Sequence, residues 1–146
     1  MDDEILVNLK ISHLEIAISL LSEKINELQS HSSSTSFYDI ENLKNTREHL
    51  KGELDKGKRY KNIDAKVKKI LSDETPYDYT PEQIEDTMSL DEDLGLGKRT
   101  IIRLAIGKFT DILKEYKPDS KIKKLEAGKL ETVKDCKALI IEKIEV

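Results

Sequence analysis

The sequence predicts an all-helical protein in which an antiparallel helical hairpin, residues 1–60, precedes a second helical unit, residues 63–146. Three observations support this fold class and this division of the chain. Only 6 Gly and 3 Pro occur among 146 residues, so few positions break helices. Apolar residues recur at spacings of three and four, the period of an amphipathic helix. The charge also changes sharply between the two halves of the chain.

The first helix follows from a row of apolar residues spaced by four and three without a break. The row consists of Val7, Ile11, Leu14, Ile18, Leu21, Ile25 and Leu28. Such a coiled-coil-like row packs lengthwise on another helix, and Asp2 or Asp3 is suited to cap its start. The polar, serine-rich run 30–36 favours side-chain to backbone hydrogen bonds over helix, so it predicts a loop.

A second helix is expected to begin at Asp39, which is a suitable cap. Arg47 interrupts the apolar stripe of this helix, which consists of Ile40, Leu43, Leu50 and Leu54. A short loop between two stripes of similar length implies antiparallel neighbours.

The first helix carries more apolar surface than one neighbour can cover. The additional residues flank its first two-thirds: Leu6, Leu9, Ile16, Ala17 and Leu20. Each leucine or isoleucine left exposed forgoes about 1.5–3 kcal/mol, so a second neighbour is expected. Two candidates remain open, namely the C-terminal half of the same chain and a second copy of the hairpin in a homodimer.

The charge reverses after the hairpin. Residues 56–69 contain seven bases and one acid, whereas residues 73–93 contain nine acids and no base. Gly57 and Asn62 near this switch suggest that the hairpin ends there and that a second unit begins. The basic stretch has no interleaved aromatic row, and the net charge is −4, so a nucleic-acid partner is not expected.

Composition also restricts the compartment and the chemistry. A single cysteine, Cys136, excludes an internal disulfide and fits a reducing compartment. No apolar run approaches the ~20 residues of a membrane helix, and the acidic start is unlike a signal peptide, so a cytoplasmic location is predicted. No catalytic or metal site is assigned: Cys136 reads as a small buried hydrophobic residue, and His13, His31 and His49 as solvent-facing.

Residues 63–144 contain an ordered set of helix signatures. Ile63, Val67 and Ile70 share one helical face, and Thr80-Pro81-Glu82-Gln83 is a helix start that precedes Ile84. The segment 89–96, Ser-Leu-Asp-Glu-Asp-Leu-Gly-Leu, leads into an amphipathic helix with Ile101, Ile102, Ala105, Phe109, Ile112 and Leu113. Thr132-Val133-Lys134-Asp135 is a capping box that opens a last helix, with Val133, Cys136, Leu139 or Ile140, and Ile144 facing inward. In this order the set resembles an acyl carrier protein, which implies a four-helix bundle.

The resemblance does not include the residue that carries the cofactor in that family. The second helix of carrier proteins opens with Asp-Ser-Leu, whose serine bears phosphopantetheine, but the matching residues here are Gly97-Lys98-Arg99. A lysine cannot form the phosphodiester, so neither phosphopantetheine nor an enzyme activity is expected. Carrier proteins also present an acidic second helix, whereas this one carries Lys98, Arg99, Arg103 and Lys108. These four residues are the predicted contacts for a protein partner with an acidic surface.

Two other functions remain open. Met88-Ser89-Leu90-Asp91 resembles the modification motif shifted upstream, so Ser89 is the alternative attachment site of a working acyl or aminoacyl carrier. That register would place Gly95 and Gly97 inside the second helix, where each glycine costs about 1 kcal/mol. The other alternative is a small regulatory nucleic-acid-binding protein that uses residues 56–69.

Overall fold

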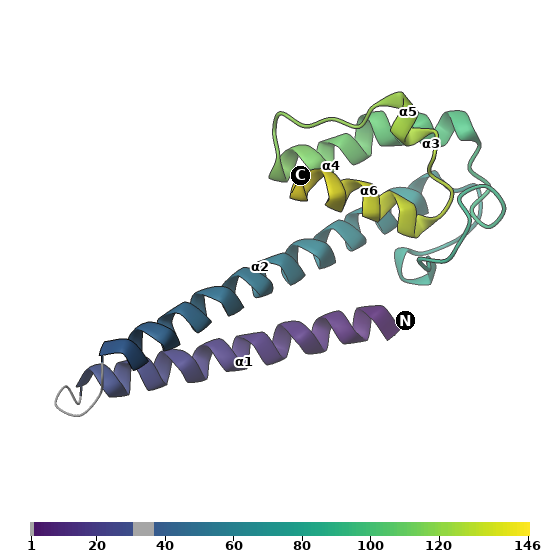
Figure 1. The fold of residues 1–146 in the computed structure, drawn as a ribbon. Coiled ribbons are helices and arrows are strands. Elements are labelled where there is room, and N and C mark those ends of the chain that lie inside the picture. Colours follow the sequence, from purple (N-terminus) through teal and green to yellow (C-terminus); the bar gives the residue numbers. More distant parts are fainter. Residues whose placement is uncertain (1, 31–36) are drawn as a thin grey trace. The chain divides into compact units, whose positions relative to one another are not determined.

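The structure, a computed structural model, describes the backbone of residues 2–30 and 37–146 and the side chains of residues 10–30 and 39–146 (Figure 1). Most of the described residues are helical and none of them lies in a strand, which confirms the all-helical prediction; an isolated bridge joins Ser89 to Thr132. His31 and nearly all of the predicted loop 30–36 lie outside the described residues, as do the side chains of Asp2 and Asp3.

The helices follow one another as α1 (Asp2–Ser30), α2 (Phe37–Glu74), the 3₁₀ turn η1 (Pro81–Gln83), α3 (Lys98–Leu104), the π-helical η2 (Ala105–Phe109), α4 (Thr110–Tyr116), α5 (Lys124–Ala127) and α6 (Val133–Glu145). The chain divides into two compact units, which meet in sequence between Lys61 and Asn62. Unit 1 contains α1 and most of α2, and unit 2 contains the end of α2 and all later helices.

In unit 1, α1 and the first part of α2 lie side by side (Figure 1). Lys10 Nζ lies 3.9 Å from a carboxylate oxygen of Glu53. A Cβ atom at Gly57 would lie 3.3 Å from Cγ1 of Ile11, so the glycine allows the two helices to approach closely at this point.

Both ends of α2 differ from the sequence-based expectation. The helix begins at Phe37, so Asp39 is not its cap but an acid of its first turn, where its charge suits the positive end of the helix. The helix also continues through Gly57 and Asn62 as far as Glu74. One glycine costs a helix only about 1 kcal/mol, and the residues around Gly57 are mostly good helix formers.

Unit 1 buries little. Ile25 is its only fully buried side chain among residues 10–30 and 39–61, and the other described members of the apolar row are half-buried. Ile16 is 58% exposed and Leu20 is 60% exposed. No described part of unit 1 therefore supplies the second neighbour that the sequence predicts for α1.

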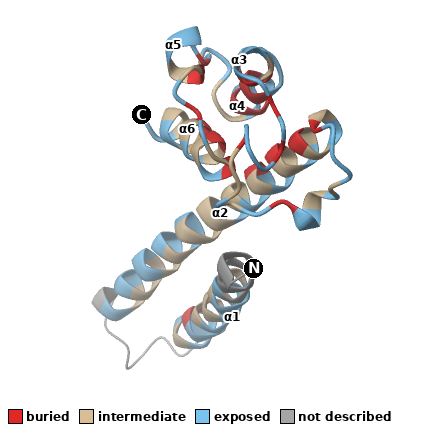
Figure 2. Ribbon diagram, turned by 90° about the vertical axis from the view of Figure 1, so that its right-hand side faces the viewer, coloured by how far each residue is buried: buried red, intermediate tan, exposed pale blue. Residues whose placement is uncertain are grey.

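Unit 2 has a continuous hydrophobic core (Figure 2). Its members include almost all of the residues predicted to face inward: Ile63, Val67, Ile84, Ile101, Ala105, Phe109, Ile112, Leu113, Val133, Cys136 and Ile140. Ile70, Ile102, Leu139 and Ile144 pack against this core while partly exposed. The helical faces predicted from apolar spacing are therefore confirmed in this unit.

Of the two predicted helix-start signatures, the one at α6 is confirmed in full and the one at η1 in part, because the Thr80 side chain makes no capping hydrogen bond. At η1, Gln83 Oε1 accepts a hydrogen bond from the Thr80 N–H at 3.0 Å. At α6, Thr132 Oγ1 accepts from the Asp135 N–H at 3.2 Å, and Asp135 Oδ2 accepts from the Thr132 N–H at 3.1 Å. This reciprocal pair satisfies two N–H groups that would otherwise lack partners at the helix start.

Residues 98–116 form one uninterrupted helical run that contains a π-turn. The Thr110 N–H bonds to the carbonyl of Ala105, five residues earlier. The buried Thr110 hydroxyl donates to the same carbonyl at 2.8 Å and accepts from the Ile122 N–H at 3.3 Å. A hydroxyl that enters the helical ladder in this way accounts for the irregular turn.

Candidate partner-binding surface

The four predicted partner-binding residues lie along the helical run of residues 98–116, and all four are exposed. Lys98 and Arg99 belong to the first turn of α3, Arg103 lies near its end, and Lys108 lies in η2. The structure separates them into two pairs, because Arg103 and Lys108 have a carboxylate partner among the described residues and Lys98 and Arg99 have none there.

Arg103 and Lys108 share Glu74, the last residue of α2. Lys108 Nζ lies 2.9 Å from Glu74 Oε1, and Arg103 Nη2 lies 3.1 Å from Glu74 Oε2. The hydrogen bond from Lys108, together with Arg103, lowers the pKa of Glu74 below its ordinary value. We refer to Glu74, Arg103 and Lys108 together as the Glu74 clamp.

The π-turn explains how two residues five apart reach the same carboxylate. In a regular α-helix, residues five apart point about 140° away from each other. A π-turn is closed by hydrogen bonds between residues five apart, so such residues become neighbours. The segment Ala105–Phe109 therefore brings Lys108 to the side of Arg103.

Lys98 and Arg99 have no ion-pair partner among the described residues. The side chain of Lys98 passes beside the end of α5, since a Cβ at Gly128 would lie 3.9 Å from Lys98 Cε. Positive charge in the first turn of a helical run is opposed by the helix dipole. These two cations therefore contribute nothing evident to the fold and remain open to a carboxylate from outside.

Ser89 forms the isolated β-bridge to Thr132 and directly precedes a turn. Its hydroxyl oxygen accepts from the Glu92 N–H at 3.1 Å, and its own N–H donates to Asp93 Oδ2 at 2.7 Å. The half-buried serine thus caps a local turn. Two backbone hydrogen bonds hold this turn against the start of α6. The Leu90 N–H donates to the Glu131 carbonyl at 2.9 Å, and the Val133 N–H donates to the Met88 carbonyl at 3.1 Å.

A second cluster of charges, which the sequence analysis did not find, joins three segments of unit 2. Lys137 Nζ lies 2.7 Å from carboxylate oxygens of both Asp64 and Asp86. Lys68 Nζ lies 3.2 Å from Asp64 and 3.4 Å from Asp86. The four side chains are 15–24% exposed, and their two acids balance their two bases. The spacing of Asp64 and Lys68, four residues on one helix, is a signal that could have revealed half of this cluster.

The charges in this cluster stabilise one another. Burial alone would raise the pKa of Asp86, but the hydrogen bond and charge of Lys137, together with Lys68, bring it below its ordinary value. Burial alone would lower the pKa of Lys137, but Asp64 and Asp86 raise it above its ordinary value. The cluster therefore holds the end of α2, the loop at residue 86 and α6 together.

The basic stretch 56–69 does not form one continuous cationic surface. Lys66 pairs with Glu115, and Lys68 belongs to the charge cluster described above. Lys56 and Arg59 lie over the ring of Tyr60, at 5.5 Å and 5.8 Å from its centroid. Several of the cations that the nucleic-acid-binding alternative would use thus have partners within the chain.

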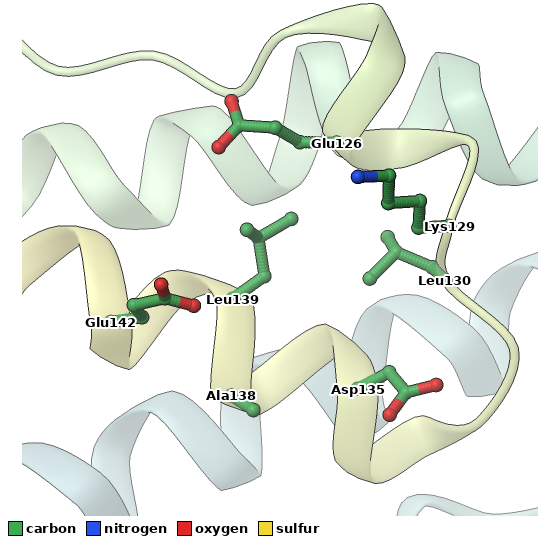
Figure 3. A pocket seen from close by; sticks show the side chains of 7 residues that line it. All are labelled: Glu126, Lys129, Leu130, Asp135, Ala138, Leu139 and Glu142. Atoms are coloured by element: carbon green, nitrogen blue, oxygen red, sulfur yellow. The ribbon is translucent and has the colours of Figure 1, made fainter.

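A shallow groove of about 350 Å³ lies between α5 and α6 (Figure 3). Its lining combines an apolar floor with acids and one lysine: Glu126, Lys129, Leu130, Asp135, Ala138, Leu139 and Glu142. Two of the acids are already used, because Asp135 closes the capping box and Glu126 lies 2.9 Å from Lys143. The hydrogen bond from Lys143 lowers the pKa of Glu126.

The remaining candidates for chemistry have other roles. Cys136 is buried, as predicted, and burial raises the pKa of its thiol to about 12, far from a reactive thiolate. His13 and His49 are exposed, as predicted. Among the described residues, no group of His, Cys, Asp or Glu side chains is arranged to hold a metal ion. Across residues 2–30 and 37–146, no helix combines the length and the apolar character needed to span a membrane.

Comparisons of the chain with family models, curated proteins and solved structures give no match.

Proposed function

We propose that this chain is a non-catalytic protein-interaction module that docks an acidic protein surface through Lys98, Arg99, Arg103 and Lys108. In this proposal an antiparallel helical hairpin is joined to an acyl-carrier-like four-helix bundle that has lost its attachment serine. The observation that carries it is the pair Lys98 and Arg99, two exposed cations without a carboxylate partner among the described residues.

The order of helical segments in unit 2 supports the carrier-like part of this proposal. The end of α2, the long connection 75–97, the helical run 98–116, the short α5 and the final α6 follow one another as the resemblance implies. Lys98 stands at the first helical position of α3, where the resemblance would require the serine. The bundle thus offers a positively charged helix in place of an attachment site.

Charge reversal at the unpaired cations tests this proposal. A fluorescent polyglutamate peptide is the probe, and its binding is measured by anisotropy at low and at moderate salt. The double variant K98E/R99E should lose most of the binding, while its helicity and stability should not fall, because acids in a first turn are favoured by the helix dipole. Since the whole chain has a net charge of −4, the probe is attracted only by a local basic surface.

The matched control is K114E/K134E, which changes the net charge by the same amount at two other exposed lysines. This control should keep the affinity of the unaltered chain. Equal losses in both double variants would show that binding follows net charge, and undiminished binding by K98E/R99E would remove this surface from the proposal.

The carrier alternative has its own measurement. Coexpression with a broad-specificity pantetheinyl transferase, followed by intact mass spectrometry, should give an unmodified chain. A phosphopantetheine adduct that disappears in the variant S89A would establish Ser89 as an attachment site and would replace the proposal made here.

We also propose that the chain forms a homodimer through the hairpin. The exposure of Ile16 and Leu20 supports this, because an apolar face that no described part of unit 1 covers favours association with a second copy. The two residues lie four positions apart on α1, so they belong to the same face of the helix and form one apolar strip.

A further inference from the structure

We propose that Arg103 and Lys108 form a carboxylate-binding site which Glu74 fills within the chain, and that an acidic partner displaces Glu74 when it docks. This inference rests on the proposed function, since it concerns the same surface. It adds that half of the basic surface is masked in the free protein and becomes available only by exchange of one carboxylate for another.

The geometry of the clamp already shows that the two cations hold a carboxylate. Each Glu74 oxygen receives one charged donor, at 2.9 Å from Lys108 and at 3.1 Å from Arg103. One acid facing two bases leaves one positive charge in excess. A glutamate or aspartate from a partner would present the same group to the same donors, so the exchange conserves the type and number of hydrogen bonds.

The exposure of the cations makes them accessible to an outside carboxylate. The Arg103 side chain is 64% exposed and that of Lys108 is 49% exposed, whereas that of Glu74 is 21% exposed. Ion pairs between exposed side chains are weak and form and break readily. An incoming acid can therefore reach Arg103 and Lys108 without any rearrangement of the core.

The position of Glu74 favours its displacement. It is the last residue of α2, and the last turn of that helix contains no base. A negative charge at the C-terminal end of a helix is opposed by the helix dipole. Glu74 is thus held at this place by Arg103 and Lys108 and not by its own helix, so a competing carboxylate faces a weakly held occupant.

This arrangement divides docking into two steps. Lys98 and Arg99, which have no partner among the described residues, attract the acidic surface first. Glu74 then acts as an intramolecular competitor. The apparent affinity for the acidic partner is the intrinsic affinity multiplied by the fraction of molecules in which the clamp is open. Removing the competitor should therefore tighten binding without adding a cation.

The decisive variant is Glu74→Gln, which keeps the size of the side chain and removes its charge. Binding of the polyglutamate peptide should tighten by about fivefold or more if the clamp is closed in most molecules. The matched control is Asp119→Asn, an exposed acid in the loop after α4 with no ion-pair partner among the described residues. It makes the same change in net charge and should alter the affinity by less than about twofold, as expected for a remote surface charge.

A double-mutant comparison shows whether the gain passes through the clamp. In the background R103Q/K108Q, the additional change E74Q should have no effect on binding, because the masked cations are absent. A gain of equal size in that background would overturn the inference. Glu74→Ala provides a second variant, checked like the first by circular dichroism, and should tighten binding as E74Q does.

The failure of this inference can be told from the failure of the proposed function. If the unaltered chain binds the peptide, K98E/R99E does not, and E74Q binds no better than D119N, the clamp is structural and the docking surface stands. If neither the unaltered chain nor E74Q binds the peptide, the docking surface is wrong and the inference falls with it.

Discussion

At the scale of single residues, Gly95 is the glycine at which an added side chain meets the closest contact. Its φ of +65° lies in the left-handed region, and a Cβ there would lie 2.8 Å from Cε2 of Tyr77. Gly95→Ala should lower the free energy of unfolding by about 1–3 kcal/mol, measured by urea denaturation of the full chain.

Gly107→Ala provides the contrast to Gly95→Ala. Gly107 lies within the helical run, and an added Cβ would meet no atom within 4 Å. Because alanine favours helix over glycine, this variant should raise the free energy of unfolding by about 0.5–1 kcal/mol. A similar loss in both variants would mean that neither backbone strain nor the contact with Tyr77 explains the effect at Gly95.

At the scale of helices and loops, the charge cluster around Lys137 is the main polar connection of unit 2. Lys137→Met leaves Asp64 and Asp86 with Lys68 alone, so two partly buried acids would share one base. We expect a loss of about 2 kcal/mol in the free energy of unfolding. Lys134→Met, an exposed lysine on the same helix, should change it by less than about 0.5 kcal/mol.

The same cluster predicts how stability depends on pH. The folded pKa of Asp86 lies below its ordinary value of 3.8, so its contribution is present above pH 4 and is lost as the pH falls through the folded pKa. The folded pKa of Lys137 lies above its ordinary value of 10.5, so its contribution is present below that value and is lost as the pH rises through the folded pKa. In the variant Lys137→Met, the free energy of unfolding should fall less when the pH is lowered, because the pKa of Asp86 is no longer lowered as far. Urea midpoints between pH 2 and pH 7 check this, and identical pH profiles for both chains would contradict it.

The helical elements show which features a sequence reveals. Phe109 and Val133 were predicted to face inward because apolar periodicity is a local property of a helix, and both are buried. The two charged clusters were not predicted, since Glu74 meets Arg103 and Asp86 meets Lys137 across long stretches of chain. No spacing rule relates residues so far apart.

The π-turn illustrates the same limit for the candidate site. The residues 98–116 read as one amphipathic helix, and Lys98, Arg99, Arg103 and Lys108 could be placed on it from the sequence. Their division into a free pair and a clamped pair could not, because it depends on the position of Glu74. The π-turn could not be predicted either, because it involves the hydroxyl of Thr110 and its hydrogen bond from the Ile122 N–H. That bond depends on the path of a distant loop.

At the scale of the whole molecule, the two units differ in how much they bury. Unit 2 has a core that draws on its long helices and on the connections between them, whereas Ile25 is the only fully buried side chain described in unit 1. Local opening is favoured where few apolar side chains are buried. The single helix α2, which contributes to both units, should therefore be stable at one end and open easily at the other.

Hydrogen exchange followed by mass spectrometry tests this difference together with the proposed homodimer. Amides of residues 63–71 in α2 should exchange much more slowly than those of residues 40–56 in the same helix. If a second copy covers Ile16 and Leu20, protection in unit 1 should rise with protein concentration by mass action, while protection in unit 2 should stay constant. The variant Leu20→Glu should abolish the dependence on concentration, because a charge would replace part of the exposed apolar strip. Equal, concentration-independent protection along all of α2 would show that unit 1 is stable without a second copy.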